Sequence, residues 1–271
     1  MSGTVRGRRR RQAWFGLKRP VKRVIAFPVV NPVARTIVRR RMGREAADRL
    51  PAPVSVRTVK GQVDDITFTM NDPAQCIIAK ELHWGGGRRP RPQDQFALEV
   101  FARLARGADR ILDIGSYTGV FSLVAARANP RARVDAFEIV PSNFLACWGN
   151  VITNDLVGGV EVHLCGVGEP GSIRVPAATG GSALPDFWSV EDQSEGSDGI
   201  EVPVVGLADA LALARVDPRA PEQHEDGRQE SGRRLLVKVD VEGHEAALVT
   251  FGNNAITAHG PTFLMEILPG A

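Results

Sequence analysis

The sequence predicts an α/β fold in which a mostly parallel sheet carries helices on both of its faces. Short apolar runs with the length of strands alternate along the chain with longer runs of helical composition. This alternation is typical of strands joined by helical crossovers, which makes neighbouring strands parallel. The expected strands are Arg110–Ile114, Val134–Phe137, Val160–Cys165, Glu201–Val205, Leu235–Val241 and Thr262–Leu268, and the expected helices include Gln93–Arg106, Asn143–Asn150, Leu207–Ala214 and Glu245–Phe251.

The segment Arg110–Glu138 has the order strand, glycine turn, helix, strand and acid. Gly115 and Gly119 allow the backbone to turn sharply and to approach a ligand without an intervening side chain. The helix expected to run to Asn129 begins with unpaired amides. Glu138 ends the next strand, where a carboxylate can accept two hydrogen bonds from a ribose diol. The segment therefore predicts a site for a nucleoside-type ligand at the carboxyl ends of the strands.

The spacing of this turn favours one class of nucleoside ligand over another. The turn has the pattern D-x-G-x-x-x-G, whereas dinucleotide-binding turns have G-x-G-x-x-G and approach a pyrophosphate closely. Asp113 precedes the turn, where its carboxylate would repel a pyrophosphate and attract an ammonium group. S-adenosylmethionine has an amino-acid ammonium and a ribose but no phosphate, so it fits better than NAD. The alternative interpretation is a glycine turn that binds nothing.

Charged residues alternate with valines at the end of the run Leu235–Val241. Lys238, Asp240 and Glu242 alternate with Val237, Val239 and Val241, so the period of two places the three charges on one side of a strand. One interpretation is a strand that lines a crevice with its charged side. The other is a buried ion pair between Lys238 and Asp240 or Glu242, because structural ion pairs also occur in such places.

Three segments together resemble a known family. DIGSYTG at Asp113–Gly119, AFEIVPSN at Ala136–Asn143 and KVDVEGHE at Lys238–Glu245 occur in this order within Asp94–Leu268. They are similar to the motifs of FkbM-type S-adenosylmethionine-dependent methyltransferases, a class I family. The resemblance implies a Rossmann-like class I methyltransferase sheet, S-adenosyl-L-methionine as cofactor, and O-methylation of a hydroxyl. It implies acceptors among sugars, glycolipids and related natural products.

The resemblance also implies roles for individual residues. The glycine turn would hold the methionine end of the cofactor, Glu138 the ribose, and the region Cys165–Val167 would lie near the adenine. Two positions depart from the family pattern: Ile139 stands where the family has proline, and Ala208 stands where it has an acid. The predicted cofactor-binding residues are Asp113, Gly115, Ser116, Gly119, Glu138, Asn143 and Gly166.

Methyl transfer to a hydroxyl also needs a group that accepts the hydroxyl proton. The candidate catalytic residues are Asp240, Glu242, His244 and Glu245, which would form the floor of the acceptor site. We expect Asp240 to be the base because it falls at the end of its strand. His244 has a suitable pKa range for this role, and its alternative interpretation is an ordinary residue in the first turn of a helix. Glu245 has the alternative role of stabilising the start of that helix.

Other chemistries have weaker support in the sequence. The acids and the single histidine near position 240 have no recognised metal-ligand spacing, so we expect no metal. The three cysteines, Cys76, Cys147 and Cys165, form neither a zinc pattern nor a disulfide framework and fit a reducing, cytoplasmic compartment. No G-x-S-x-G elbow is present, which argues against a serine hydrolase.

Charge divides the chain into regions. The chain carries a net charge of +3, but residues 1–44 contain 14 basic residues and no acid, which leaves 20 basic and 31 acidic residues for the rest. We expect a basic N-terminal arm at 1–44, a small extension at 45–92 with strands between Gln62 and Glu81, and a methyltransferase domain at 93–271. The arm has three interpretations: a solvated arm, a peripheral contact with an anionic membrane, or a nucleic-acid arm, for which no recognised module is present.

Three further expectations concern loops and the end of the chain. The polar loop 177–199 contains Phe187 and Trp188 and is either a lid over the acceptor or an ordinary surface loop, and 217–234 is expected to be disordered. The sheet is expected to lack its last two strands, so that a homo-oligomer could complete it. This feature motivates an alternative function, a truncated, non-catalytic methyltransferase-like protein that binds only cofactor or a partner.

Overall fold

The computed structural model describes residues 50–177, 199–213, 234–241 and 245–265, together with Val33 and Thr36. The predictions for the basic arm (Val33 and Thr36 apart), for most of the loops 177–199 and 217–234, and for Glu242, His244 and residues 266–271 lie outside this part of the chain. Within it, no helix has the length and apolar character needed to cross a membrane.

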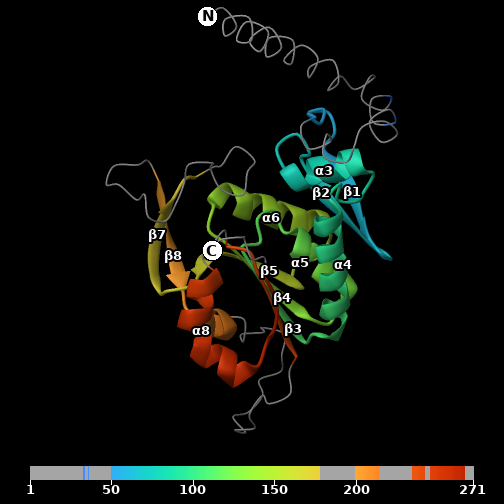
Figure 1. Ribbon diagram of the computed structural model, residues 1–271. Helices are drawn as coiled ribbons and strands as arrows, with labels where there is room; N and C mark the ends of the chain where they lie inside the picture. The colour runs from blue at the N-terminus through green and yellow to red at the C-terminus, as the bar shows by residue number, and fades with distance from the viewer. Residues whose placement is uncertain are drawn as a thin grey trace, which may run out of the picture. The chain divides into compact units, whose positions relative to one another are not determined.

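Five strands form the main sheet, and every neighbouring pair in it is parallel. Their order across the sheet is β10-β9-β3-β4-β5 (Figure 1). β3, the first of these five strands in the sequence, therefore lies in the middle. The chain then adds β4 and β5 on one side of it and β9 and β10 on the other. The strands are β3 (Arg110–Ile114), β4 (Arg133–Glu138), β5 (Val160–Leu164), β9 (Leu235–Val239) and β10 (Thr262–Met265). The predicted parallel sheet is confirmed. In folds of this kind, ligands bind beyond the carboxyl ends of the strands, at the point where the strand order reverses.

Helices cover both faces of this sheet, as predicted (Figure 1). The register pairs Leu112 with Asp135 and with Val237, so the side chains of these residues share one face. On that face Leu112, Ile114, Val237 and Val239 pack in one apolar core with residues of α7 (Leu207–Leu213) and α8 (Glu245–His259). On the opposite face Asp113 bonds to α5 (Val120–Ala128), and α6 (Pro141–Thr153) packs beside α5.

The prediction that Glu201–Val205 belongs to the main sheet is wrong. This segment is β8 (Ile200–Val205), which lies in a separate three-stranded sheet of order β6-β8-β7. β6 (Gly166–Val167) pairs with β8 in parallel and β7 (Gly171–Val175), which was not predicted, pairs with it antiparallel. The physical reason is exposure: Glu201 and Pro203 are exposed on β8, whereas a strand of a sheet covered on both faces would have to bury them.

The N-terminal extension was predicted to form strands from Gln62 to Glu81, and this is only partly correct. β1 (Thr58–Val63) and β2 (Ile66–Asn71) form a two-stranded sheet, but the end of the predicted stretch is helical in α3 (Ile77–Gly85). The Sγ atom of Cys76 accepts a hydrogen bond from the amide of Ala79 and caps this helix. Gly86, with φ 72°, ends it. The cap supplies a helix start that strand-like composition does not reveal.

The chain divides into two compact units. One consists of the described residues up to Gln62 together with Met70–Gln95, and the other consists of Val63–Thr69 and the described residues from Phe96 onward. α4 (Pro92–Gly107) leads into β3. All of the candidate site residues that the structure describes belong to the second unit.

Candidate functional site

The predicted glycine turn lies at the carboxyl end of β3 and has an unusual backbone. Gly115, Tyr117 and Gly119 have φ angles of 73°, 51° and 83°, in the left-handed region that glycine adopts without strain. The amides of Gly115 and Ser116 both donate to the carbonyl of Phe137 on β4, at 3.0 and 2.9 Å. The turn is thus fixed against the end of the neighbouring strand.

Both glycines are also required by close packing. A Cβ atom at Gly115 would lie 1.8 Å from the carbonyl oxygen of Asp240, and one at Gly119 would lie 2.6 Å from the Sγ atom of Cys147. The turn is therefore held between the end of β9 and helix α6, and Asn150 of α6 also donates to the Thr118 carbonyl at 2.8 Å. The contribution of α6 was not predicted, because nothing in the spacing of its residues points to the turn.

Glu138 ends β4 and lies beside the turn, as its position in the sequence predicted. Its two carboxylate oxygens accept hydrogen bonds from the amides of Tyr117 and Val140, each at 2.8 Å. The side chain is buried, and this burial raises the pKa of Glu138 from 4.5 to about 7, against the opposing effects of neighbouring amides and of the Lys238 charge. A carboxyl group that is half protonated near neutral pH thus stands at the end of the strand next to the glycine turn.

Asp113 lies beneath the turn and is fully buried. Its Oδ2 atom accepts hydrogen bonds from the amide and the hydroxyl of Ser122 in the first turn of α5, at 3.0 and 2.7 Å. Its Oδ1 atom lies 3.4 Å from the Nζ atom of Lys238. In this arrangement the carboxylate connects β3 to α5 and to β9, in addition to any attraction that it exerts on a bound cation.

The ion-pair interpretation of the charged run on β9 is confirmed. The Nζ atom of Lys238 lies 3.4 Å from the Oδ2 atom of Asp240 and donates to the carbonyl of Gly115 at 2.8 Å. Burial lowers the pKa of Lys238, but the carboxylates of Asp113 and Asp240 outweigh it and raise the pKa above 10.5. Lys238 is buried, whereas the side chain of Asp240 is 32% exposed. The outer member of the pair is therefore accessible to solvent at the end of the strand.

The remaining predicted residues lie around this centre in different ways. Glu245 begins α8, and its carboxylate accepts a hydrogen bond from the amide of Val241 at 3.1 Å, the geometry expected of its alternative role at the helix start. Asn143 is buried in the first turn of α6. Gly166 lies on β6, where an added Cβ would be 3.2 Å from the side chain of Ile139, the residue after Glu138.

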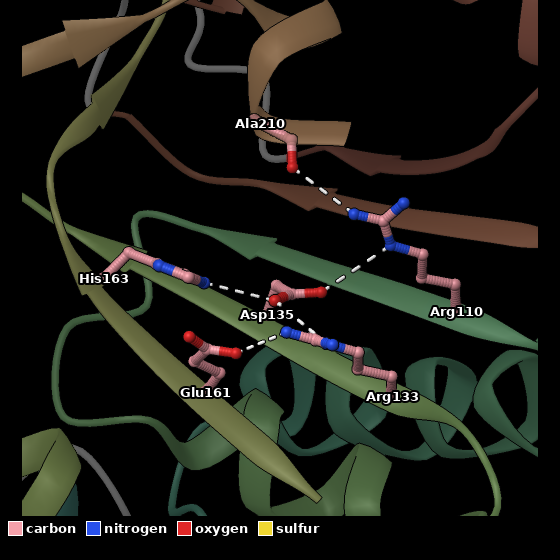
Figure 2. A network of polar contacts seen from close by, with 6 residues as sticks. All are labelled: Arg110, Arg133, Asp135, Glu161, His163 and Ala210. Carbon is pink, nitrogen blue, oxygen red and sulfur yellow. Dashed lines mark hydrogen bonds and ion pairs between the residues drawn. The ribbon is translucent and has the colours of Figure 1, made fainter. Parts of the chain in front are cut away.

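A second cluster of charges was not predicted (Figure 2). Asp135 lies in the middle of β4, fully buried, with its carboxylate 3.1 Å from His163, 3.5 Å from Arg133 and 3.6 Å from Arg110. Arg133 also pairs with Glu161, and Arg110 donates to the carbonyl of Ala210 at 3.4 Å. The signal in the sequence is an acid inside the predicted strand Val134–Phe137, whose other residues are apolar.

This cluster has the residue types of a metal site but the charges of a satisfied ion network. Asp135, Glu161 and His163 place one possible ligand atom each within 4.8 Å of one another. However, the guanidinium groups of Arg110 and Arg133 already neutralise the two carboxylates. The ring of His163 also stacks on Phe137 at a centroid distance of 4.8 Å. We interpret the cluster as a structural connection between β3, β4 and β5.

No protein-family model matches the chain. The chain is 30% identical to methyltransferase sdnD of Sordaria araneosa over 147 residues, which are 50% of the chain and 57% of that protein. It is 30% identical to methyltransferase 1 of Beauveria bassiana (strain ARSEF 2860) over 141 residues, 50% of the chain and 55% of that protein. The chain thus spans little more than half the length of these curated relatives.

Among solved structures, methyltransferase FkbM from Methylobacillus flagellatus KT is similar to 69% of the chain and 54% of its own length, with 13% sequence identity and a TM-score of 0.36. The strand order places β3 in the middle of the sheet, and the glycine turn lies beside the acid Glu138. These two features and the similarity to the curated methyltransferases indicate the same fold. The chain is therefore a Rossmann-like α/β protein that is similar in sequence to curated methyltransferases over half of its length.

Proposed function

We propose that this protein is an S-adenosylmethionine-dependent O-methyltransferase that acts on a hydroxyl group of a sugar, a glycolipid or a related natural product. One observation carries the proposal. The glycine turn is flanked by the buried carboxyl group of Glu138 on one side and by the partly exposed carboxylate of Asp240 on the other. Two acids in different environments beside one turn can serve a ribose and an acceptor separately.

The donor set at the turn fits an adenosyl cofactor. The carboxyl group of Glu138 accepts amide hydrogen bonds from Tyr117 and Val140 and lies at the end of its strand, where a carboxylate can bind a ribose diol. Asp113 and Asp240 supply negative charge near the amino-acid end, where the ligand carries an ammonium.

The chemistry asked of the protein is simple. S-adenosylmethionine supplies an electrophilic methyl group, whose bond to sulfur breaks as a bond to the acceptor oxygen forms and the electron pair returns to sulfur. Asp240 would accept the hydroxyl proton, since its carboxylate is held through one oxygen by Lys238 and is accessible to solvent. The rigid turn would fix the cofactor relative to this base, and such positioning is worth as much as ~7–11 kcal/mol in favourable intramolecular reactions.

The substrate class rests on the motifs DIGSYTG, AFEIVPSN and KVDVEGHE. The curated relatives support methyl transfer at the general level only, because their names specify neither the acceptor nor the atom that is methylated. Transfer to oxygen is the part of the proposal that Asp240 supports, since a hydroxyl benefits from a carboxylate that takes its proton.

The first experiment measures binding of S-adenosylhomocysteine, the thioether product, to the full chain by calorimetry, with NAD as the comparison ligand. We expect micromolar binding of the thioether and none of NAD. Glu138→Ala should abolish binding, whereas Glu169→Ala, at an exposed glutamate outside the turn, should preserve it. A folded wild-type protein that binds NAD, or that binds neither ligand, contradicts the proposal.

A second experiment tests turnover with S-adenosylmethionine carrying a labelled methyl group and a panel of sugars and glycolipids. We expect labelled product with at least one hydroxyl acceptor and a loss of about 10²- to 10⁴-fold in turnover for Asp240→Asn, the range for removal of a general base. Unchanged turnover in Asp240→Asn would exclude Asp240 as the base. Binding of the thioether without transfer to any acceptor would favour a cofactor-binding protein instead.

A further inference from the structure

One buried ammonium group lies at the centre of the acids that surround the glycine turn. The Nζ atom of Lys238 lies 3.4 Å from Asp113 and 3.4 Å from Asp240, and its charge also lowers the pKa of Glu138. It donates to the carbonyl of Gly115 at 2.8 Å. The charged groups that face the ammonium are therefore acids from β3, β4 and the end of β9.

The surroundings hold this charge in place. The Nζ atom lies 5.1 Å from the centre of the Phe121 ring in α5, a cation–π distance. Lys238 is buried on a fully buried strand, so water cannot screen its interactions. Its carboxylate partners keep the lysine protonated at neutral pH. The ammonium is thus a permanent positive charge directly beneath the turn.

Such a charge matters because the two ligands of a methyltransferase differ in charge. S-adenosylmethionine carries a sulfonium, an ammonium and a carboxylate, with a net charge of +1, whereas S-adenosylhomocysteine has lost the sulfonium charge and is neutral. Asp113 and Asp240 both attract a cation at the turn. Without Lys238 they would favour the cationic ligand strongly, and part of that stabilisation would be lost when the sulfonium charge disperses in the transition state.

We propose that Lys238 is a specificity-determining residue whose buried ammonium offsets Asp113 and Asp240 and so sets the ratio of affinities for the cationic methyl donor and the neutral thioether product. This inference rests on the proposed function, because it concerns the same ligands. The inference goes beyond the proposed function because it assigns to Lys238 a role that depends on the charge of the lysine, not only on its packing.

The test compares the dissociation constants of S-adenosylmethionine and S-adenosylhomocysteine, measured by calorimetry on the full chain. Lys238→Met should raise the preference for the cationic ligand by about tenfold, which corresponds to about 1.4 kcal/mol. Asp240→Asn should lower the preference by a similar factor. The double variant, in which both charges are removed, should return the ratio to near the wild-type value.

Two controls separate charge from structure. Lys60→Met removes an exposed lysine from β1 and should leave the ratio unchanged. A lysine that only supported the fold would weaken both ligands equally on replacement, so an unchanged ratio in a folded Lys238→Met variant overturns the inference. If that variant fails to fold, Asp240→Asn decides, because an unchanged ratio there overturns it as well.

The outcomes also distinguish the inference from the proposed function. Wild-type protein that binds neither ligand removes the proposed function, and the inference with it. Wild-type protein that binds both ligands, with variants whose ratios do not move, removes only the role of Lys238.

Discussion

Replacement of Glu138 by glutamine tests the electrostatics of the candidate site without any ligand. Burial raises the pKa of this carboxyl group from 4.5 to about 7 in the folded protein. The folded state therefore keeps a proton on Glu138 that the unfolded chain has already released between pH 4.5 and about pH 7. Because the folded state binds more protons in this window, the free energy of unfolding falls as pH rises through it and levels off above about pH 7.

The size of the effect follows from the width of the window. One pH unit of difference corresponds to about 1.4 kcal/mol, so Glu138 should cost the folded protein about 3 kcal/mol between pH 4.5 and pH 7. Glutamine has nearly the same shape and stays neutral at every pH. The Glu138→Gln variant should therefore gain about 3 kcal/mol relative to the wild type as pH rises across the window.

Urea denaturation followed by tryptophan fluorescence at several pH values from 4.5 to 8 measures this difference. Groups other than Glu138 titrate in both proteins and cancel in the comparison. Glu169→Gln, at an exposed position, is the matched control and should show no relative gain. Parallel curves for the wild type and Glu138→Gln would refute the reasoning, because they would mean that burial does not penalise the Glu138 carboxylate.

Three further predictions concern stability and can be measured by the same denaturation assay. Gly115→Ala should destabilise the protein by more than about 2 kcal/mol, since it combines a left-handed backbone with a Cβ atom 1.8 Å from the carbonyl oxygen of Asp240. A Cβ atom at Gly171 would meet nothing within 4 Å, so Gly171→Ala should be nearly neutral. Equal effects of the two substitutions would be inconsistent with this packing. Asp135→Asn should cost about 3 kcal/mol, because it removes the buried charge that two partly buried guanidinium groups share, and a cost below about 1 kcal/mol would show that the network is weakly coupled. Glu245→Ala should cost about 1 kcal/mol through loss of its hydrogen bond at the start of α8 and leave thioether binding intact; lost binding with unchanged stability would instead support a role in the site.

The main sheet could be predicted because its signals are local. β3, β4 and β5 appear in the sequence as short apolar runs within a residue or two of their observed bounds. The glycine turn could be predicted for the same reason, since the left-handed backbone at these two positions favours glycine, and the sequence has Gly115 and Gly119 there. The position of Glu138 beside the turn followed from parallel strands ending at one edge of a sheet.

Predictions were wrong where the composition of a segment suggested a different secondary structure, or where it did not specify which sheet a strand joins. The segment at 77–81 has the composition of a strand, but the cap by Cys76 starts a helix there. Glu201–Val205 is a strand, as expected, yet nothing in six residues states which sheet it joins. Its exposed Glu201 and Pro203 were the available clue that it could not lie inside a sheet covered on both faces.

By itself the sequence determined the strands of the main sheet, where the backbone turns at Gly115–Gly119, and which acid follows the next strand. Only the tertiary structure decided which charges meet. Lys238 contacts Asp113 because β9 pairs with β3 in a register that sets these two residues side by side. Asp135 meets Arg110 because β4 pairs with β3 in a register that sets Asp135 beside Leu112, two residues from Arg110 on the same face. Strand order and register depend on the packing of helices and strands far apart in the chain, so spacing could supply the local pair of Lys238 and Asp240 but not the partners on other strands.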